Sequence, residues 1–172
     1  QAKRVKAKPV AAKAGGKGRV VAKMNSLLES EVIDALYEAS KAGVEIDLII
    51  RGVCALRPGV PGLSENIRVR SIIGRFLEHH RIFYFLAGGK ETVYLSSADW
   101  MERNFFKRIE LAFPILDPKL KKRVITEGLK FYLADNQQGW EMSSQGAYQR
   151  RRSSRSKPHN AQGELMVTLG NV

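Results

Sequence analysis

The sequence predicts an α/β fold with a mixed, mostly parallel sheet flanked by helices. Residues 18–25 and 44–52 are apolar and β-branched, as strands are, and a helical pattern separates them. A strand, a helix and a strand in this order predict two parallel strands over 19–52, joined by a right-handed crossover. Arg51 lies at the carboxyl end of the second strand, where open parallel sheets bind ligands.

The predicted helix has a start signal, a stop signal and an apolar face. Ser26 and Glu29 form a capping-box pattern at its start, and Gly43 is a residue favoured just past a helix end. The spacing of its apolar residues places one set of side chains on a single face, namely Val32, Ile33, Leu36 and Ala39.

A loop rich in glycine and proline, 57–66, precedes another strand, 67–73. The strand alternates, which predicts that Arg68 and Arg70 share one face. The residues of the opposite face are Ile67, Val69 and Ser71.

Two further strands, 81–86 and 91–97, flank the loop 87–90, which contains two glycines and predicts a hairpin. Simple register pairs Leu86 with Glu91 and Arg81 with Ser96. The same register brings His79 beside Ser97 and Ala98.

The last part of the core is predicted to contain a strand and a long helix. Residues 108–116 have the composition of a strand, and Asp117 and Pro118 are favoured residues for the N-cap and first turn of a helix. The buried face of that helix is predicted to include Leu120, Val124 and Phe131.

The charge of the chain favours anionic partners. Lysine and arginine number 29 against 17 acids, a formal net charge of +12. Residues 1–18 are predicted to be a basic, flexible lead-in, and 135–172 a basic tail with short terminal elements. Both ends fit solvated tails as well as polyanion-binding arms.

The single cysteine, Cys54, excludes an internal disulfide and a cysteine-based zinc cluster, which is typical of a reducing compartment. The apolar segments are far shorter than the ~20 residues of a transmembrane helix. We therefore expect a soluble, cytoplasmic protein with no transmembrane segment.

Histidines and arginines suggest a phosphate-handling edge. The stretch that holds Arg51, Arg68, Arg70, Arg75 and Arg81 contains no lysine, and the planar arginine fork suits bidentate phosphate contacts. Two histidines, His79 and His80, lie within it. A histidine among arginines has its cationic form disfavoured and is suited to proton transfer, but a packed, hydrogen-bonded histidine fits the same pattern.

Short polar residues extend the candidate site. Lys23 and Asn25, at the end of the first parallel strand, are predicted to lie at the same edge as Arg51. Ser97 and Asp99 can orient an imidazole or bind a phosphate oxygen, and they equally suit a capped turn that closes a strand.

Two long segments carry a resemblance to a known family. They are "AKMNSLLESEVIDALYEASKAGVEIDLIIRGVCALRPGVPGLSENIRVRSIIGRFLEHHRIFYF" and "VYLSSADWMERNFFKRIELAFPILDP". They resemble the C-terminal domain of bacterial polyphosphate kinase, the long multidomain type with a phospholipase D-like fold. The resemblance implies that 19–134 is the phospholipase D-like C-terminal catalytic domain. It also implies reversible transfer of the ATP γ-phosphate to polyphosphate through a phosphohistidine on a preceding domain that is absent here, so the isolated fragment is expected to be inactive.

The resemblance assigns roles to two residues. Arg51, in "IIRG", matches the family's nucleotide-binding arginine, and His79, the first histidine of "EHHR", matches its second essential histidine. His79 is thus the catalytic candidate, and Arg51 and His79 are the nucleotide- and phosphate-binding candidates. His80 is expected to face the other side and to be structural. Weaker candidates, either for phosphate contacts or for support of the residues that make them, are Lys23, Asn25, Arg68, Arg70, Ser97 and Asp99.

The resemblance also implies cofactors and partners. Mg²⁺ is expected with ATP, although no metal ligands are assigned and no acidic cluster here forms a complete site. The expected partners are ATP or ADP, polyphosphate, the remaining domains of the enzyme and further copies in a homo-oligomer, with no specific nucleic acid. The alternative function is a non-enzymatic module that binds polyanions, nucleic acid or polyphosphate, electrostatically. A phospholipase D-like nuclease is disfavoured, because the H-x-K-x-x-x-x-D motif would need lysine and aspartate at Arg81 and Leu86.

Overall fold

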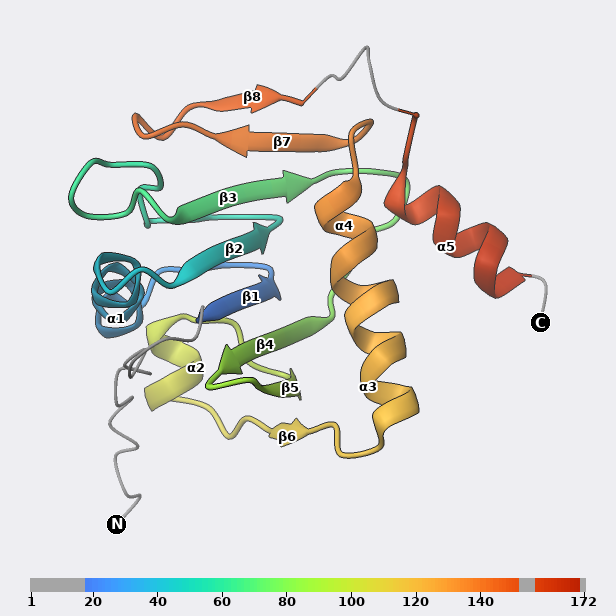
Figure 1. Cartoon of the computed structure of the whole chain (residues 1–172), viewed down its shortest axis with the longest axis horizontal. Coiled ribbons are helices and arrows are strands. Elements are labelled where there is room, and N and C mark those ends of the chain that lie inside the picture. The colour runs from blue at the N-terminus through green and yellow to red at the C-terminus, as the bar shows by residue number, and fades with distance from the viewer. Residues whose placement is uncertain (1–17, 152–156, 171–172) are drawn as a thin grey trace.

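The computed structural model describes residues 18–151 and 157–170, and the predicted lead-in lies outside them except for Gly18. One mixed sheet forms the centre of the described part, with helices on both faces (Figure 1). Its strands are β1 (Arg19–Met24), β2 (Glu45–Ile50), β3 (Ile67–Ile72), β4 (Arg81–Ala87), β5 (Lys90–Ser96), β6 (Ala112–Pro114), β7 (Gly139–Met142) and β8 (Tyr148–Arg150). Their order across the sheet is β6-β5-β4-β1-β2-β3-β7-β8.

The parallel part of the sheet is limited to β1, β2 and β3. The predicted parallel pair is confirmed, in a register that runs from Arg19 opposite Glu45 to Met24 opposite Ile50. Of the described strand pairings, two are parallel and five antiparallel, so the prediction of a mostly parallel sheet is wrong. The physical reason is that short connections such as the β4–β5 turn can join only antiparallel neighbours.

The predicted register of the hairpin is confirmed, but its loop is shorter than the predicted 87–90, because Ala87 pairs with Lys90. Leu86 pairs with Glu91, and Arg81 pairs with Ser96. The turn uses Gly88 and Gly89, both in the positive-φ region that glycine adopts without strain.

Helix α1 (Ser30–Lys41) covers one face of the sheet. Its predicted apolar face is confirmed, and the chain leaves the helix through Gly43, at a φ of 82°. The capping box is wrong: Glu29 is the N-cap, and its carboxylate accepts a hydrogen bond from Val32 N at 2.7 Å. Leu27 forms bridges with Cys54 and Trp100, which keeps the backbone extended beyond Ser26.

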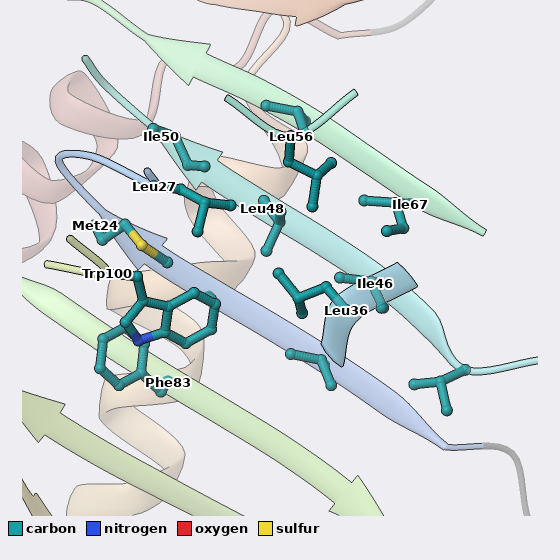
Figure 2. Close-up of a cluster of buried hydrophobic side chains, with 14 residues drawn as sticks. Met24, Leu27, Leu36, Ile46, Leu48, Ile50, Leu56, Ile67, Phe83 and Trp100 are labelled. Atoms are coloured by element: carbon teal, nitrogen blue, oxygen red, sulfur yellow. The ribbon is translucent and has the colours of Figure 1, made fainter. Parts of the chain in front are cut away.

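The core on this face combines strands, helix and loops (Figure 2). Leu36 of α1 and Leu56 of the loop between β2 and β3 are buried against β1, β2 and β3. Trp100 stacks on Phe83 with ring centroids 4.8 Å apart, which joins the end of the hairpin to the same core. Backbone hydrogen bonds from Trp100 N to Ser26 O and from Leu28 N to Trp100 O place the segment after β5 beside the residues that follow β1.

The other face is covered by a helical segment made of α3 (Pro118–Ile125), the π-helical turn η1 (Thr126–Lys130) and α4 (Phe131–Ala134). Asp117 is the N-cap, as predicted, and accepts from Leu120 N at 2.8 Å. The predicted burial of Leu120 is wrong, since 53% of it is exposed, whereas Val124 and Phe131 pack against the core. The π turn shifts the phase of the apolar face, so that Leu129 and Tyr132 are the buried side chains.

The predicted strand 108–116 is mostly wrong. Strand β6 has three residues at the sheet edge, and the short helix α2 (Glu102–Phe106) precedes it. Residues just before β6 are held by the serines that end β5, because Ser96 Oγ donates to Leu111 O at 3.0 Å.

The part of the chain predicted as a tail with short terminal elements contains β7, β8 and helix α5 (Ala161–Gly170). Strand β7 pairs with β3 and β8 with β7, so both extend the sheet. Within the described residues, none of the helices has the length and apolar character to cross a membrane.

Candidate functional site

The candidate site lies at the carboxyl ends of β1 and β2, beside the segment that leads into β4. Lys23, Asn25 and Arg51 meet here, as the parallel pairing predicted. A small pocket at this edge is lined by Lys23, Met24, Asn25, Ile49, Arg51, Ile72, Glu78 and His80.

The strongest indication that this edge binds an anion comes from the side chain of Arg51. Its Nη1 is buried and has no hydrogen-bond partner among the described residues. A buried donor left unpaired is costly, so this nitrogen favours a negatively charged partner. The neighbouring arginines differ, because Arg68, Arg70 and Arg81 are all hydrogen-bonded.

Lys23 is buried and fully engaged. Its ammonium pairs with the Glu78 carboxylate, contacts His80 Nε2 at 2.6 Å and lies 3.6 Å from the centre of the Tyr132 ring. Burial lowers the pKa of Lys23 to about 8, with a smaller contribution from Arg51, although Glu78 opposes the change. The Lys23 ammonium therefore interacts with protein groups and is not available to bind a ligand.

Glu78 contacts three side chains from different parts of the chain. Its carboxylate accepts from Tyr132 Oη at 2.6 Å and from Gln162 Nε2 at 2.9 Å, in addition to the ion pair with Lys23. Burial alone would raise the pKa of Glu78, but Lys23 and these hydrogen bonds outweigh it and lower that pKa. The carboxylate stays ionised.

The two adjacent histidines have separate partners, as expected for side chains that point in different directions. His80 contacts Lys23, and although 39% of its side chain is exposed, partial desolvation of the ring and the Lys23 charge lower the pKa of His80 to about 4 despite Glu78. Because an ammonium only donates, the Nε2 of His80 accepts and its ring is neutral. The structural role of His80 stays a prediction.

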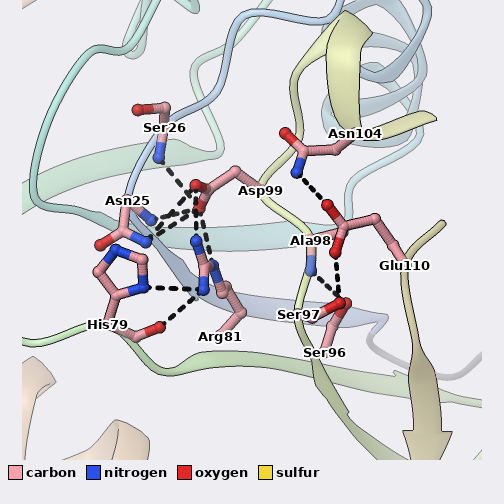
Figure 3. Close-up of polar contacts among 10 residues, drawn as sticks. All are labelled: Asn25, Ser26, His79, Arg81, Ser96, Ser97, Ala98, Asp99, Asn104 and Glu110. Carbon is pink, nitrogen blue, oxygen red and sulfur yellow. Dashed lines mark hydrogen bonds and ion pairs between the residues drawn. The ribbon is translucent and has the colours of Figure 1, made fainter. Parts of the chain in front are cut away.

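His79 is exposed and is held by Arg81 (Figure 3). Arg81 Nη1 lies 3.0 Å from His79 Nδ1 and donates to the His79 carbonyl oxygen, also at 3.0 Å. A guanidinium cannot accept a hydrogen bond, so Nδ1 is the acceptor. In the neutral ring the proton therefore resides on Nε2, which is left available as a donor.

Behind Arg81 lies Asp99, a buried carboxylate that several donors surround. It accepts from Arg81 Nε at 3.2 Å, from Asn25 N at 2.8 Å and from Ser26 N at 3.4 Å. Burial would raise the pKa of Asp99, but Arg81 and Asn25 outweigh it and lower that pKa. Asn25 and Asp99 were predicted either to contact phosphate or to support the residues that do; in the structure they support the arginine that holds His79.

Three predicted residues lie apart from this edge. Ser97 hydrogen-bonds Glu110, and Figure 3 shows that pair directed away from His79, so the structure brings Asp99, not Ser97, into the network of His79. Arg68 and Arg70 share a face, as predicted. Arg68 is paired with Asp47 at 2.9 Å, and Arg70 is bonded to the carbonyl oxygen of Leu133.

Four residues of the site were absent from the predicted set: Glu78, Arg81, Tyr132 and Gln162. Arg81 had a signal, because it belongs to the lysine-free arginine stretch, and Glu78 directly precedes His79. Tyr132 and Gln162 had none, because they lie 54 and 84 residues from Glu78 in the chain.

The residues of this edge do not fit a magnesium ion. Among residues 18–151 and 157–170 no group of three or more histidine, cysteine, aspartate or glutamate side chains is arranged to hold a metal. The nearby carboxylates, Glu78 and Asp99, are already neutralised by Lys23 and Arg81. No step of the chemistry below is routed through a metal held by this chain.

The fold and the basic edge place the chain in a known structural class. It is similar to a phospholipase D family member, Nuc from Salmonella typhimurium, with a TM-score of 0.54 over 78% of this chain and 88% of that one. The sequences are 18% identical, so this likeness shows the phospholipase D-like fold alone.

The family follows from closer matches. The protein-family model described as "Polyphosphate kinase C-terminal domain 2" matches residues 2–162 of this sequence. The chain belongs to this family. It is 67% identical over 156 residues to a polyphosphate kinase of Burkholderia cenocepacia and 70% identical to one of Burkholderia lata. Each match covers 91% of this chain and 23% of the relative. The crystal structure of polyphosphate kinase from Porphyromonas gingivalis is 45% identical, with a TM-score of 0.87 over 91% of this chain and 24% of that one.

Proposed function

We propose that this chain supplies a nucleotide- and phosphate-binding edge to a polyphosphate kinase, which transfers the ATP γ-phosphate reversibly to polyphosphate through a phosphohistidine carried outside this chain. Family membership supports the reaction class, while the chain spans 23% of the curated relatives it matches. The observation that carries the proposal is the buried Nη1 of Arg51 at the carboxyl edge of the sheet, which has no hydrogen-bond partner within the part of the chain that the structure describes.

The proposed chemistry needs fixed donors aimed at a transferring phosphoryl group. Charge builds on its equatorial oxygens, and donors that need no rearrangement stabilise it. Arg51 is the proposed charged donor, because its Nη1 is buried without a hydrogen-bond partner in the described part of the chain, whereas Arg68, Arg70 and Arg81 are each bonded to a protein oxygen. His79 is the proposed second donor through Nε2–H, which Arg81 leaves free by occupying Nδ1.

The remaining expectations belong to the proposal as well. Mg²⁺ would enter with ATP and offset its charge, held by the nucleotide and by groups outside this chain. The partners are ATP or ADP, polyphosphate, the remaining domains of the enzyme and further copies in a homo-oligomer in the cytoplasm, with no specific nucleic acid.

The proposal is tested by titration with ATP and with polyphosphate in a full-length relative whose matching portion is replaced by this chain. Arg51→Ala is expected to weaken nucleotide binding about tenfold or more. His79→Ala is expected to lower turnover about 100-fold or more. The matched control is Arg123→Ala, which removes an exposed arginine of α3 that pairs with Glu127 of η1.

A purely electrostatic polyanion module predicts another result. All variants would bind with nearly equal affinity, and that affinity would fall steeply with salt for each of them. Equal binding by Arg51→Ala and Arg123→Ala, with normal turnover of His79→Ala, would overturn the proposed function.

A further inference from the structure

The segment between β3 and β4, residues 73–80, carries His79 and has no regular secondary structure. Much of it faces solvent: Ile73, Phe76 and Leu77 are 58%, 47% and 83% exposed. Neither a sheet ladder nor a helix holds these residues, so the position of His79 depends on side-chain contacts.

Gln162 of α5 supplies one of these contacts in an unusual form. Its Oε1 accepts from Phe76 N at 2.9 Å, and its Nε2 donates to Phe76 O at 3.0 Å. The side-chain amide therefore pairs with both backbone groups of a single residue, as a neighbouring strand would. Gln162 is 5% exposed, so water does not compete freely for these bonds.

Gly74 allows this approach. A Cβ built on Gly74 would overlap Oε1 of Gln162 and lie 2.9 Å from its Cδ. The backbone of the segment and the Gln162 amide are thus in direct contact at a position without a side chain, an observation independent of the hydrogen bonds.

The same amide reaches the residue next to His79. Gln162 Nε2 also donates to Glu78 Oε1 at 2.9 Å, beside the bonds that Glu78 makes with Tyr132 and Lys23. Helix α5, helix α4 and strand β1 are joined at Glu78, one residue before the proposed catalytic histidine. On the far side, Arg81 holds the His79 ring and carbonyl.

Gln162 is itself held at the start of α5. Asp135 is fully buried, and its Oδ2 accepts from Ala161 N at 2.8 Å while its Oδ1 accepts from Gln137 N at 2.9 Å. These bonds attach the first turn of α5 to the end of α4. They therefore limit the movement of the backbone that carries the Gln162 side-chain amide.

We propose that Gln162 is a positioning residue that holds the 73–80 segment, and with it His79, in the geometry that phosphoryl transfer requires. The proposal rests on the proposed role of His79. It makes helix α5 part of the support of the site, although α5 contributes no group that touches the substrate.

The test uses the full-length relative that carries this chain, with Gln162→Met and the control Gln149→Met. Gln149 is an exposed glutamine of β8 that makes no side-chain hydrogen bond within the described residues. Gln162→Met is expected to speed hydrogen exchange at the Phe76 amide and to lower kcat about 10- to 100-fold, because a misplaced catalytic group costs turnover. The KM for ATP should change less than about twofold, since Arg51 is untouched.

A second variant separates loss of position from misfolding. Gln162→Glu keeps an oxygen that can accept from Phe76 N, but it puts a carboxylate in place of the amide donor toward Glu78. The negative charge of Glu78 raises the pKa of this new carboxylate. The other charged or titratable groups that face this place are Lys23 of β1, Tyr132 of α4 and His80, with Arg51 beside Lys23. Protonation restores a donor, so the kcat of Gln162→Glu, divided by that of the unchanged protein, is expected to rise as the pH falls.

Each result decides the matter. Faster Phe76 exchange with reduced kcat in Gln162→Met, and recovery of Gln162→Glu at lower pH, support the positioning role. Unchanged exchange, unchanged kcat despite faster exchange, or a kcat ratio for Gln162→Glu that does not vary with pH overturns it. His79→Ala, measured in parallel, shows whether a failure belongs to the proposed function instead: normal turnover there removes the role of His79 itself.

Discussion

The Arg81 guanidinium makes two hydrogen bonds to the Asp99 carboxylate, from Nε at 3.2 Å and from Nη2 at 3.0 Å. Its remaining nitrogen, Nη1, holds the ring and carbonyl of His79. Both partners of the ion pair are largely buried, with side chains 14% and 6% exposed. A carboxylate three residues past β5 therefore governs the orientation of a histidine that precedes β4.

Asp99→Asn is expected to lower the free energy of unfolding by about 3 kcal/mol, because it leaves the Arg81 charge buried without its counter-charge. Urea denaturation measures this change. Glu102→Gln removes the exposed pair between Glu102 and Lys107 and should cost less than about 1 kcal/mol. Similar losses in the two variants would contradict the importance of the buried pair.

His80 is expected to make the folded chain sensitive to mild acid. Its pKa is lowered from 6.5 to about 4, so between these values the unfolded chain binds a proton that the folded chain does not, and stability falls as the pH falls. Glu78 and Asp99, whose pKa values are also lowered, add to this loss only as the pH approaches and passes their ordinary values of 4.5 and 3.8.

The thermal unfolding midpoint, followed from pH 6.5 to pH 5, isolates the contribution of His80. His80→Gln should flatten the slope over this range, while the control His159→Gln should keep the slope that His80 causes. An unchanged slope in His80→Gln would show that the folded chain protonates His80 as readily as the unfolded chain does.

Cys54 is expected to react slowly with alkylating reagents. Burial raises the pKa of its thiol to about 11, against a weaker opposing contribution from the backbone of Leu56. At pH 8 the thiolate fraction should be about 100-fold below that of a thiol with the ordinary value of 9.0. The rate of iodoacetamide alkylation, compared between the folded and urea-unfolded chain, checks this, and equal rates would refute it.

Gly74→Ala is expected to reproduce the effect of Gln162→Met on hydrogen exchange at the Phe76 amide, because the added Cβ displaces the Gln162 side chain. Gly163→Ala is the matched control on α5, where a Cβ would meet only ordinary contacts of 3.6 Å or more. The control should keep Phe76 exchange unchanged and, as a helical Gly→Ala change, stabilise by up to about 1 kcal/mol. Normal exchange in Gly74→Ala would mean that the segment adjusts without losing its contact.

Local patterns predicted those parts of the fold that depend on neighbouring residues. The hairpin register, the parallel β1–β2 pair and the apolar face of α1 are confirmed, because turn length and side-chain periodicity determine them. The errors lie where an element depends on distant contacts. Leu27 bridges to Trp100 and delays the start of α1. After the π turn Leu129 and Tyr132 are the buried side chains, while Leu120, in the first turn of α3, stays exposed.

The sequence by itself determined the class of fold, the basic character of the chain and the edge of the sheet that brings Lys23, Asn25 and Arg51 together, since these follow from composition, periodicity and strand order. The tertiary structure alone decided which charges are neutralised: Asp47 pairs with Arg68 and Asp99 with Arg81, while one buried nitrogen of Arg51 has no partner among residues 18–151 and 157–170. It also brought Gln162 to Phe76, 86 residues away in the chain. Hydrogen bonds and ion pairs act over about 3 Å in space, and no periodic pattern in a single sequence encodes which distant side chains come that close.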